Sequence, residues 1–464
     1  MTELLPPSAL PTFRDPAGSL EVRADGAYRS LRAPFDAEIL EFLATPLASE
    51  LVSQGRLVAS EVVSPASGET LVLRHPRVSF QSYPWEWSPA MWLAAAELTL
   101  TLCSDLVEQG WQLKDATPLN VLFQGGRPVF VDVLSIERRD LHQPIWLAYG
   151  QFVRTFLLPM LAYSRLGWPL QLSLTRRDGY EPEEIYPKLS WSSRVQQPAL
   201  SSVTLPSLLS KRAKTRSVTT RAIKDTDLAK HILLKTLKSL LSQMRKVTPA
   251  HSASTWSDYA ETATHYSDED HTRKRKFVME TLGKARPSKV LDVGCNTGVY
   301  SNLAADAGAE VVSIDTDLQA VDRLSTNLKG KEKNILPLFV DLAYPSPATG
   351  WENRESASFL SRCASHFDMV MMLAVLHHLL LRNQIPMDRI AALCSGLTTR
   401  DLIVEWVPST DPKFQELLRG REALYEHITE AAFREAFGAY FTISDELTLE
   451  NGRTMFYLQK RLDA

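Results

Sequence analysis

The sequence has few cysteines, no long apolar run and little net charge. Its four cysteines are widely separated among 464 residues and form no CxxC pair. This excludes a disulfide framework or a zinc ribbon and is typical of a reducing compartment. Lysine and arginine number 51 against 54 aspartates and glutamates, which gives a net charge of −3. Any contact with nucleic acid would therefore have to come from a local basic patch.

The sequence also shows no sign of a signal peptide or a membrane span. Residues 1–16 are polar and lack a basic segment followed by an apolar one. Residues 369–381 form the most apolar stretch, but His377 and His378 interrupt it. The stretch is shorter than the ~20 residues that a membrane-spanning helix needs. We therefore expect a cytoplasmic protein.

Changes in composition along the chain predict three parts. Residues 1–200 are rich in aromatic side chains and arginine, and their first lysine is Lys114. Residues 201–250 form a connector in which lysines and arginines far outnumber acids. Residues 251–464 alternate short apolar runs with helical patterns, as α/β domains do. Hydrophobic residues make up 44% of the chain and charged ones 23%, so we expect globular domains.

The last part has the pattern of a parallel sheet covered by helices. Its apolar runs predict seven strands, at 289–293, 309–315, 335–340, 367–373, 402–407, 441–444 and 454–458. Helical patterns fill the gaps, for example at 299–307 and 318–328. Strands that alternate with helices run parallel, whereas the last two runs predict a closing antiparallel pair. We therefore expect an α/β fold with helices on both faces of the sheet.

Polar residues follow three of these strands, at the sheet edge where such folds bind ligands. The first strand leads into the turn Asp292-x-Gly294-x-x-x-Gly298, whose glycines let the backbone approach a ligand closely. The amino terminus of the next helix offers free N–H groups to a carboxylate or phosphate. Asp315 ends the second strand and could accept two ribose hydroxyl hydrogen bonds, while Asp341 could accept one from an adenine amino group. The pattern indicates a nucleotide-type site; acidic residues that merely cap helices are the alternative.

The D-x-G-x-x-x-G spacing and the later strand ends resemble class I S-adenosylmethionine-dependent methyltransferases. Residues 290–301 match that family's first motif, and 314–315, 340–341 and 367–379 fall where its later motifs belong. The resemblance implies a seven-stranded Rossmann-like sheet over residues 251–464, with S-adenosylmethionine as cofactor and methyl transfer as activity. The cofactor-binding residues that it implies are Asp292, Gly294, Cys295, Asn296, Gly298, Asp315, Asp341, Leu342, Leu373, Tyr259 and Tyr266.

Three of these residues have an open alternative. Tyr259 and Tyr266 precede the first strand, where the family often has a lid helix. They would cap the sulfonium by cation–π contact, but simple helix packing explains them equally well. We expect Cys295 to be a small packing residue, because methyl transfer needs no covalent enzyme intermediate. The resemblance implies no metal.

Two histidines are the candidates for the general base. His377 is the first choice and His378 the second, because both follow the fourth strand, where residues facing the acceptor lie in this family. An imidazole titrates near ~6.5 and can accept a proton at neutral pH; helix capping and packing are the alternative. Residues 373–376 lack the N/D-P-P-Y/F motif of relatives that methylate bases or glutamine. This favours O-methylation of a small-molecule, natural-product or glycan-type acceptor. Three further residues could shape the acceptor pocket: Glu405, Trp406 and Asp411.

The first part contains a helix pattern at 98–109 and then a loop, 113–132, with a hairpin turn at its two adjacent glycines. This loop resembles the catalytic loop of protein-kinase-like phosphotransferases, particularly the aminoglycoside and choline kinase branch. The residues that would orient the attacking hydroxyl and hold magnesium are Asp115, Asn120 and Asp132. Position 113 lacks the usual histidine. No lysine precedes Lys114, so the lysine that pairs with the phosphates in this family is missing, and an arginine such as Arg32 would have to replace that lysine. We therefore expect an α+β kinase-like domain that is degenerate and binds substrate; Mg-ATP is a cofactor only if it is active. A plain hairpin with surface carboxylates is the alternative.

The combination is similar to a bacterial group of fused methyltransferases in nodulation-factor, polysaccharide and secondary-metabolite gene settings. In the connector, residues 228–247 predict a helix with an apolar stripe and lysines opposite. Such a helix could lie on an anionic membrane or follow phosphates, but packing between domains is the more common use. The alternatives to a simple methyltransferase are a bifunctional enzyme that also phosphorylates its acceptor, an RNA methyltransferase, and a binding module that uses the cofactor only for structure. We do not expect nucleic acid as a partner.

Overall fold

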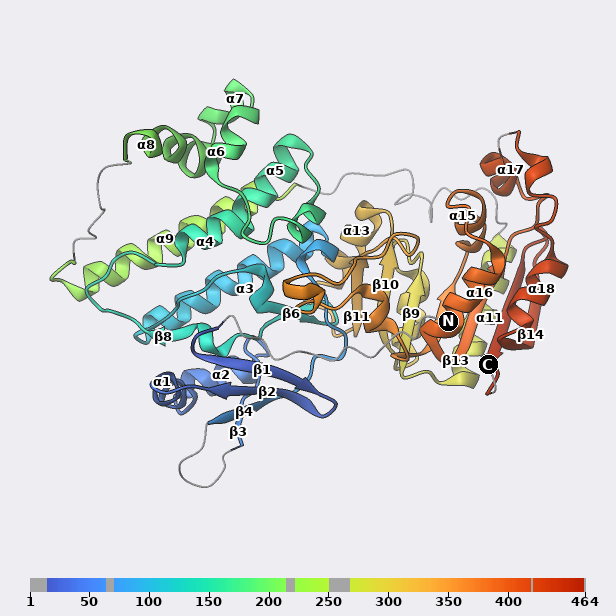
Figure 1. The fold of residues 1–464 in the computed structure, drawn as a ribbon, viewed down its shortest axis with the longest axis horizontal. Coiled ribbons are helices and arrows are strands. Elements are labelled where there is room, and N and C mark those ends of the chain that lie inside the picture. The colour runs from blue at the N-terminus through green and yellow to red at the C-terminus, as the bar shows by residue number, and fades with distance from the viewer. Residues whose placement is uncertain (1–14, 64–70, 214–221, 250–267, 419, 463–464) are drawn as a thin grey trace. The chain divides into compact units, whose positions relative to one another are not determined.

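The computed structural model of the chain describes residues 15–63, 71–213, 222–249, 268–418 and 420–462 (Figure 1). The described residues form two compact units. We call those from 15 to 249 the amino-terminal unit and those from 268 to 462 the carboxyl-terminal unit.

The carboxyl-terminal unit is built on a seven-stranded sheet with the order β11-β10-β9-β12-β13-β15-β14. Its strands are β9 (Lys289–Val293), β10 (Glu310–Asp315), β11 (Ile335–Phe339), β12 (Phe367–Met372), β13 (Thr398–Trp406), β14 (Phe441–Thr448) and β15 (Thr454–Lys460). The pairs formed among β9 to β13 are parallel, and β15 pairs antiparallel with both β13 and β14. The predicted fold of this unit, a parallel sheet with an antiparallel edge, is confirmed.

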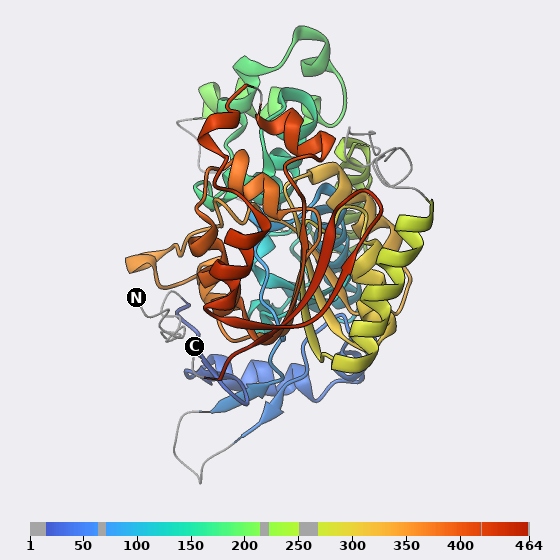
Figure 2. The ribbon, with the colours of Figure 1, turned by 90° about the vertical axis from the view of Figure 1, so that its right-hand side faces the viewer.

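Helices cover both faces of this sheet (Figure 2). They are α11 (Asp268–Ala285), α12 (Val299–Asp306), α13 (Leu318–Leu328), α14 (Phe359–Cys363), α15 (Leu376–Leu381), α16 (Met387–Leu397), α17 (Pro412–Leu418) and α18 (Glu430–Gly438). In α13 the Asp317 side chain accepts hydrogen bonds from the first-turn N–H groups, and Leu324 and Leu328 are buried. The capping residue and the apolar stripe together explain why this segment forms a helix that packs on the sheet.

The amino-terminal unit begins with a four-stranded antiparallel sheet in the order β1-β2-β4-β3. Its strands are β1 (Gly18–Arg23), β2 (Gly26–Leu31), β3 (Glu61–Val62) and β4 (Val72–His75). Two more strand pairs follow: β5 (Trp111–Leu113) with β8 (Ile136–Arg138), and β6 (Val121–Gln124) with β7 (Arg127–Phe130). The β6–β7 pair is the predicted hairpin with its two-glycine turn.

The helices of the amino-terminal unit are α1 (Phe35–Leu43), α2 (Pro46–Ser53), α3 (Pro89–Glu108), α4 (Tyr149–Phe152), α5 (Leu158–Leu166), α6 (Pro182–Ile185), α7 (Trp191–Val195), α8 (Leu205–Ala213) and α9 (Thr226–Val247). By length and composition α3 could cross a membrane. However, its side chains Trp92, Ala95 and Leu106 are fully buried, as in the core helix of a globular unit. The pattern at 98–109 predicts this helix but misses its start at Pro89, which Ser88 caps.

The helix α9 is the one predicted in the basic connector. Asp225 caps its start by accepting hydrogen bonds from the N–H groups of Asp227 and Leu228. Its apolar stripe, which includes Leu233 and Leu240, is buried, and the helix packs against α3 and α5. The apolar stripe is therefore used within the amino-terminal unit.

Candidate functional site

The turn between β9 and α12 contains residues in the left-handed region of backbone conformation. Gly294, Asn296 and Gly298 have φ values of 73°, 49° and 85°. A Cβ atom on Gly294 would lie 2.2 Å from Cγ2 of Val375, and one on Gly298 would lie 2.5 Å from Cδ1 of Leu324. Both glycines are therefore required by the packing of the protein itself, in addition to any approach of a ligand.

Hydrogen bonds tie this turn to the end of β10. The N–H group of Cys295 donates to the carbonyl oxygen of Ile314 at 3.1 Å, and that of Asn296 donates to Oδ2 of Asp315 at 2.8 Å. At the start of α12, Gly298 has no side chain, and no side chain of the described residues caps the helix. The first-turn N–H groups of α12 are therefore the donors that this turn can offer to a carboxylate.

Asp315 has acceptor capacity left after its bonds to the protein. Its Oδ2 accepts from the N–H group of Asn296 and its Oδ1 from that of Asp317, both at 2.8 Å. Each carboxylate oxygen can accept two hydrogen bonds, so each can take one more. Burial raises the pKa of this carboxyl group, while the backbone N–H bonds oppose the shift. Two adjacent acceptors on one rigidly held carboxylate fit the two hydroxyl groups of a ribose.

The next strand end supplies a second carboxylate and an apolar neighbour. Asp341 is the second residue after β11, and its Oδ1 accepts a hydrogen bond from the N–H group of Ala343 at 2.8 Å. Leu342 is buried, as is Leu373, which follows β12. These strand ends lie at the carboxyl edge of the parallel sheet together with Asp315, which is the arrangement that the sequence predicts.

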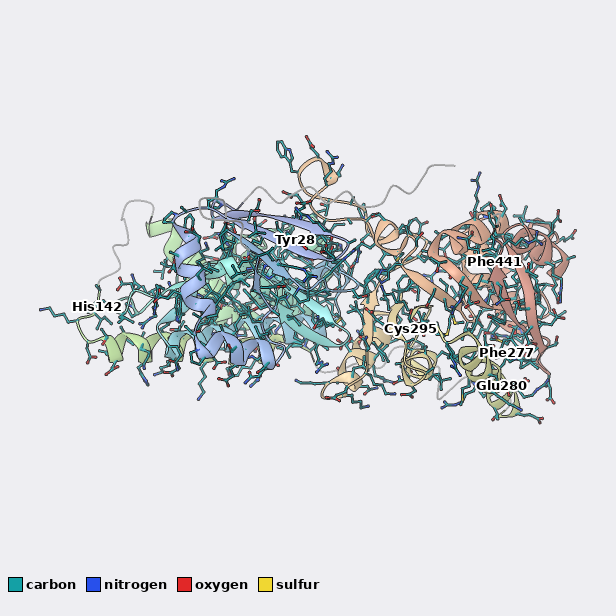
Figure 3. All side chains as sticks on the ribbon, turned by 90° about the horizontal axis from the view of Figure 1, so that it is seen from below. Tyr28, His142, Phe277, Glu280, Cys295 and Phe441 are labelled. Atoms are coloured by element: carbon teal, nitrogen blue, oxygen red, sulfur yellow. The ribbon has the colours of Figure 1, made fainter. Side chains whose placement is uncertain are left out.

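Asp292 and Cys295 lie inside the unit rather than at its surface; Figure 3 shows Cys295 within the carboxyl-terminal unit. Asp292 accepts a hydrogen bond from Oγ of Ser301 at 2.6 Å, and Ser313 donates to Ser301 at 2.8 Å. Burial raises the pKa of Asp292 to about 6 and that of the Cys295 thiol well above its usual range. The Asp292 side chain therefore connects β9 with α12 and β10, and the Cys295 thiol stays protonated.

Both candidate bases lie in α15, with ring centroids 4.3 Å apart. His377 is 3% exposed, and its Nδ1 has no hydrogen-bond partner among the described residues. Burial, together with the charges of Arg453 and Lys274, lowers the pKa of His377 well below 6.5; burial lowers that of His378 to about 4. Both rings are therefore neutral at pH 7. This is the form that can accept a proton, although a lowered pKa also makes the ring a weaker base.

Four charged side chains form a buried network near the end of β13. Nζ of Lys274 lies 2.6 Å from Oε2 of Glu405. Arg453 lies 3.5 Å from Oε1 of Glu405 through Nη1 and 2.7 Å from Oδ2 of Asp411 through Nε. Glu405 and Asp411, which the sequence suggested for the acceptor pocket, thus bind cations of the protein, and Trp406 is buried. Sequence reasoning missed Lys274 and Arg453, because 131 and 48 residues separate them from Glu405.

In the amino-terminal unit, the kinase-like candidates lie in one cluster. Asn120 donates to Oγ of Ser135 at 3.2 Å, and Ser135 donates to Oδ2 of Asp132. Oδ1 of Asp132 lies 3.0 Å from Nη1 of the buried Arg29. Burial raises the pKa of Asp115, and the charge of Asp132 adds to this shift. The carboxylate of Asp132 is therefore paired with Arg29, a contact that the sequence did not predict.

Two candidates cannot be placed: Tyr259 and Tyr266 lie outside the described residues. Within the described ranges, no group of three or more histidine, cysteine, aspartate or glutamate side chains is arranged to hold a metal ion.

The strand order, the glycine turn and the acidic strand ends define the Rossmann-like fold of class I methyltransferases. A protein-family profile described as a methyltransferase domain matches residues 265–396. The chain is 33% identical over 85 residues to the malonyl-[acyl-carrier protein] O-methyltransferase of Pseudescherichia vulneris. This aligned region covers 17% of this chain and 34% of that protein. Among solved structures, the N-methyltransferase NodS from Bradyrhizobium japonicum WM9 with S-adenosyl-L-homocysteine is 14% identical. That match covers 44% of this chain and 98% of NodS, with a TM-score of 0.31.

The similarity to one protein extends over almost the whole chain. Nodulation protein NoeA of Rhizobium meliloti (strain 1021) is 31% identical over 469 aligned positions, which cover 97% of this chain and 95% of NoeA. The chain therefore belongs to the NoeA family, and its amino-terminal unit is part of what the family shares. It is an S-adenosylmethionine-dependent methyltransferase.

Proposed function

We propose that this enzyme methylates a hydroxyl group of a small-molecule, natural-product or glycan-type acceptor. The proposal is carried by His377, which is neutral and buried, with an Nδ1 atom that no described residue engages. The helix that holds it starts beside the glycine turn, since Val375 packs against Gly294. A proton acceptor is thus located beside the turn expected to bind the cofactor.

The residues present fit S-adenosylmethionine as follows. Asp315 would hold the ribose hydroxyl groups, Asp341 and Leu342 the adenine, and the first turn of α12 the carboxylate of the methionine moiety. When bound, the cofactor supplies an electrophilic methyl group. The enzyme's own task is then to orient the acceptor and to take its proton, which we assign to Nδ1 of His377, with His378 as the second candidate.

Oxygen is favoured over nitrogen as the methylated atom. Residues 373–376 read Leu-Ala-Val-Leu and offer no side-chain amide or carboxylate to hold an amino group. The matched relative from Pseudescherichia vulneris is named as an O-methyltransferase. Neither observation identifies the acceptor molecule, so the test has to compare hydroxyl and amine acceptors directly.

The experiment incubates the full chain with methyl-labelled S-adenosylmethionine and matched sugar acceptors that carry either a free hydroxyl or a free amine. We expect label at oxygen. His377→Gln should lower kcat by roughly 10²–10⁴-fold, as loss of a general base does, with unchanged affinity for S-adenosylhomocysteine. Label mainly at nitrogen would reject O-methylation, and full activity of His377→Gln would reject the base assignment alone.

For the amino-terminal unit we propose a degenerate kinase-like domain that binds substrate. In support, Arg29 and Ser135 together engage both carboxylate oxygens of Asp132, the residue expected to hold magnesium. A bifunctional enzyme would instead hydrolyse or transfer phosphate from Mg-ATP, and Asp132→Ala would abolish this activity. Absence of Mg-ATP turnover in the full chain, with methyl transfer intact, would support the substrate-binding role.

A further inference from the structure

A polar groove lies between α9 and the segment that follows α7 in the amino-terminal unit. The groove encloses about 790 Å³ including its open side, and all of its lining residues are polar: Gln197, Ser201, Lys235, Lys238, Ser239, Ser242, Gln243 and Lys246. Six of the eight come from one face of α9. The apolar stripe of that helix is buried elsewhere, so this face makes no part of the hydrophobic packing of the helix.

Hydrogen bonds fix the shape of the groove. Oε1 of Gln243 accepts from Ser202 at 3.0 Å and from Ser201 at 3.4 Å, while its Nε2 donates to Ser239 at 3.2 Å. Ser201 also donates to Oε1 of Gln197 at 2.7 Å. Gln243 thus links α9 to the opposite wall of the groove.

The groove is positively charged, and its charge is available to a ligand. Neighbouring cations on α9 are paired: Lys230 with Glu108 at 3.4 Å and Arg245 with Glu97 at 2.7 Å. By contrast, no carboxylate within the described ranges forms an ion pair with the three exposed lysines that line the groove, Lys235, Lys238 and Lys246. At 1.5 Å per residue, these ammonium groups are distributed over ~16 Å of helix. Such a row matches a linear ligand with several anionic groups better than a single phosphate ion.

The neutral side chains of the groove distinguish between linear polyanions. Single-stranded nucleic acid binds to basic grooves that also present aromatic rings on which bases stack. No aromatic residue is among the described residues that line this groove, whereas serine hydroxyl and glutamine amide groups line it together with the lysines. Hydroxyl and amide groups are suited to the hydroxyl groups of a sugar.

From this combination we infer that the groove between α9 and residues 197–201 binds an acidic oligosaccharide. The inference concerns a binding surface and does not depend on which atom the enzyme methylates. It gives the amino-terminal unit a ligand of its own, consistent with a role in holding a glycan.

The inference is tested by titration calorimetry on the full chain at low salt with three probes of equal length: hexagalacturonate, uncharged cellohexaose and the RNA hexauridylate. We expect hexagalacturonate to bind more tightly than the other two. The triple variant Lys235→Gln/Lys238→Gln/Lys246→Gln should weaken its binding roughly tenfold to a hundredfold, because it removes all three charges. The matched control, Lys276→Gln/Lys284→Gln/Lys329→Gln, makes the same change in net charge in the carboxyl-terminal unit and should bind as the parent chain does.

Binding of hexauridylate as tight as that of hexagalacturonate would overturn the inference in favour of nucleic acid. An equal loss of hexagalacturonate affinity in both triple variants would overturn the inference, because net charge alone would then explain the binding. No binding of hexagalacturonate to the parent chain would also reject it. S-Adenosylhomocysteine affinity, measured on the same variants, should stay unchanged. Failure of the groove inference is thereby separated from failure of the methyltransferase assignment, which the groove lysines do not affect.

Discussion

At the scale of single residues, Asp315 combines a structural and a binding role. One oxygen of its carboxylate holds the N–H group of Asn296 in the glycine turn, and the other holds that of Asp317 at the start of α13. The remaining acceptor capacity is directed by these two bonds, so the side chain cannot turn away from a ligand without breaking them. The residue is therefore preorganised for binding.

We expect Asp315→Ala to weaken S-adenosylhomocysteine binding at least tenfold, because a hydrogen bond to a charged group contributes about 1.5–3 kcal/mol. Titration calorimetry measures this effect. The control is Asp317→Ala, which removes the cap of α13 and should lower the melting temperature without a comparable loss of affinity. Unchanged affinity in Asp315→Ala would exclude the ribose assignment.

His378 gives the carboxyl-terminal unit a pH-dependent stability. Its pKa is about 4 in the folded chain and ~6.5 in an unfolded one. Between these values the unfolded chain binds the proton and the folded chain does not, so this stability is present above pH 6.5 and is lost as the pH falls toward 4.

We therefore expect His378→Gln to lose less stability than the parent chain between pH 7 and pH 4.5. Thermal unfolding at a series of pH values measures the difference. His427→Gln removes an exposed histidine of the same unit and serves as the control, with the slope of the parent chain. Parallel curves for His378→Gln and the parent would contradict the burial of this ring.

The candidate site shows which residues can be predicted from sequence. Asp315 and Asp341 are predictable because each ends a recognisable strand, and parallel strands bring their carboxyl ends together. Lys274 and Arg453 are not, because their partner Glu405 lies on a different strand and only the folded sheet joins them. Arg29 likewise reaches Asp132 from a distant part of the amino-terminal unit's sequence, and no local pattern predicts this pair.

At the scale of elements, the β9–α12 turn combines a left-handed backbone with close packing. A comparison of Gly298 with Gly308 distinguishes the contribution of the backbone from that of the packing. Gly298 has φ of 85° and faces Leu324, whereas Gly308 has φ of 97° and no neighbouring atom within 4 Å of the point that a Cβ atom would occupy. Alanine at either position meets the same left-handed backbone, but only at Gly298 does the new methyl group overlap a neighbour.

Gly298→Ala should therefore destabilise the unit by about 1–3 kcal/mol more than Gly308→Ala, the usual cost of overpacking. Chemical denaturation of the two variants gives the comparison. We also expect only Gly298→Ala to weaken S-adenosylhomocysteine binding, because only that residue lies in the turn. Equal losses of stability would show that strain alone determines the effect.

The network around Glu405 connects α11 and β13 with Arg453, the residue that precedes β15. Removing one cation leaves buried carboxylates uncompensated, so Arg453→Met should cost about 3–5 kcal/mol of unfolding free energy. The double variant Arg453→Met/Asp411→Asn also removes the carboxylate charge that Arg453 compensates and leaves Lys274 paired with Glu405, so it should recover part of the loss. Denaturant titration of the two variants measures the recovery, and its absence would contradict the ionic role of Arg453.

The sequence predicts the presence of each strand better than it predicts where the strand begins and ends. The seven strands are found from their apolar runs, yet β13 begins at Thr398 and β14 extends to Thr448, beyond the predicted 402–407 and 441–444. Both extensions carry polar side chains, and their strand conformation comes from pairing with neighbouring strands. Hydrophobicity alone cannot report such pairing.

At the scale of the whole molecule, the two compact units should respond differently to ligands. S-Adenosylhomocysteine binds the folded carboxyl-terminal unit, so at about 100 times its Kd it should stabilise that unit by about 2.7 kcal/mol. Scanning calorimetry of the full chain should show a shift confined to one transition. A shift of both transitions by the same amount would show that the units unfold as one.

The ion pair between Arg29 and Asp132 also determines how the amino-terminal unit should respond to its surroundings. A counterion that is covalently part of the polypeptide can be neither diluted nor chelated. The melting temperature of this unit should accordingly not change when EDTA or magnesium is added, in contrast to a kinase whose carboxylate is neutralised by a magnesium ion from solution.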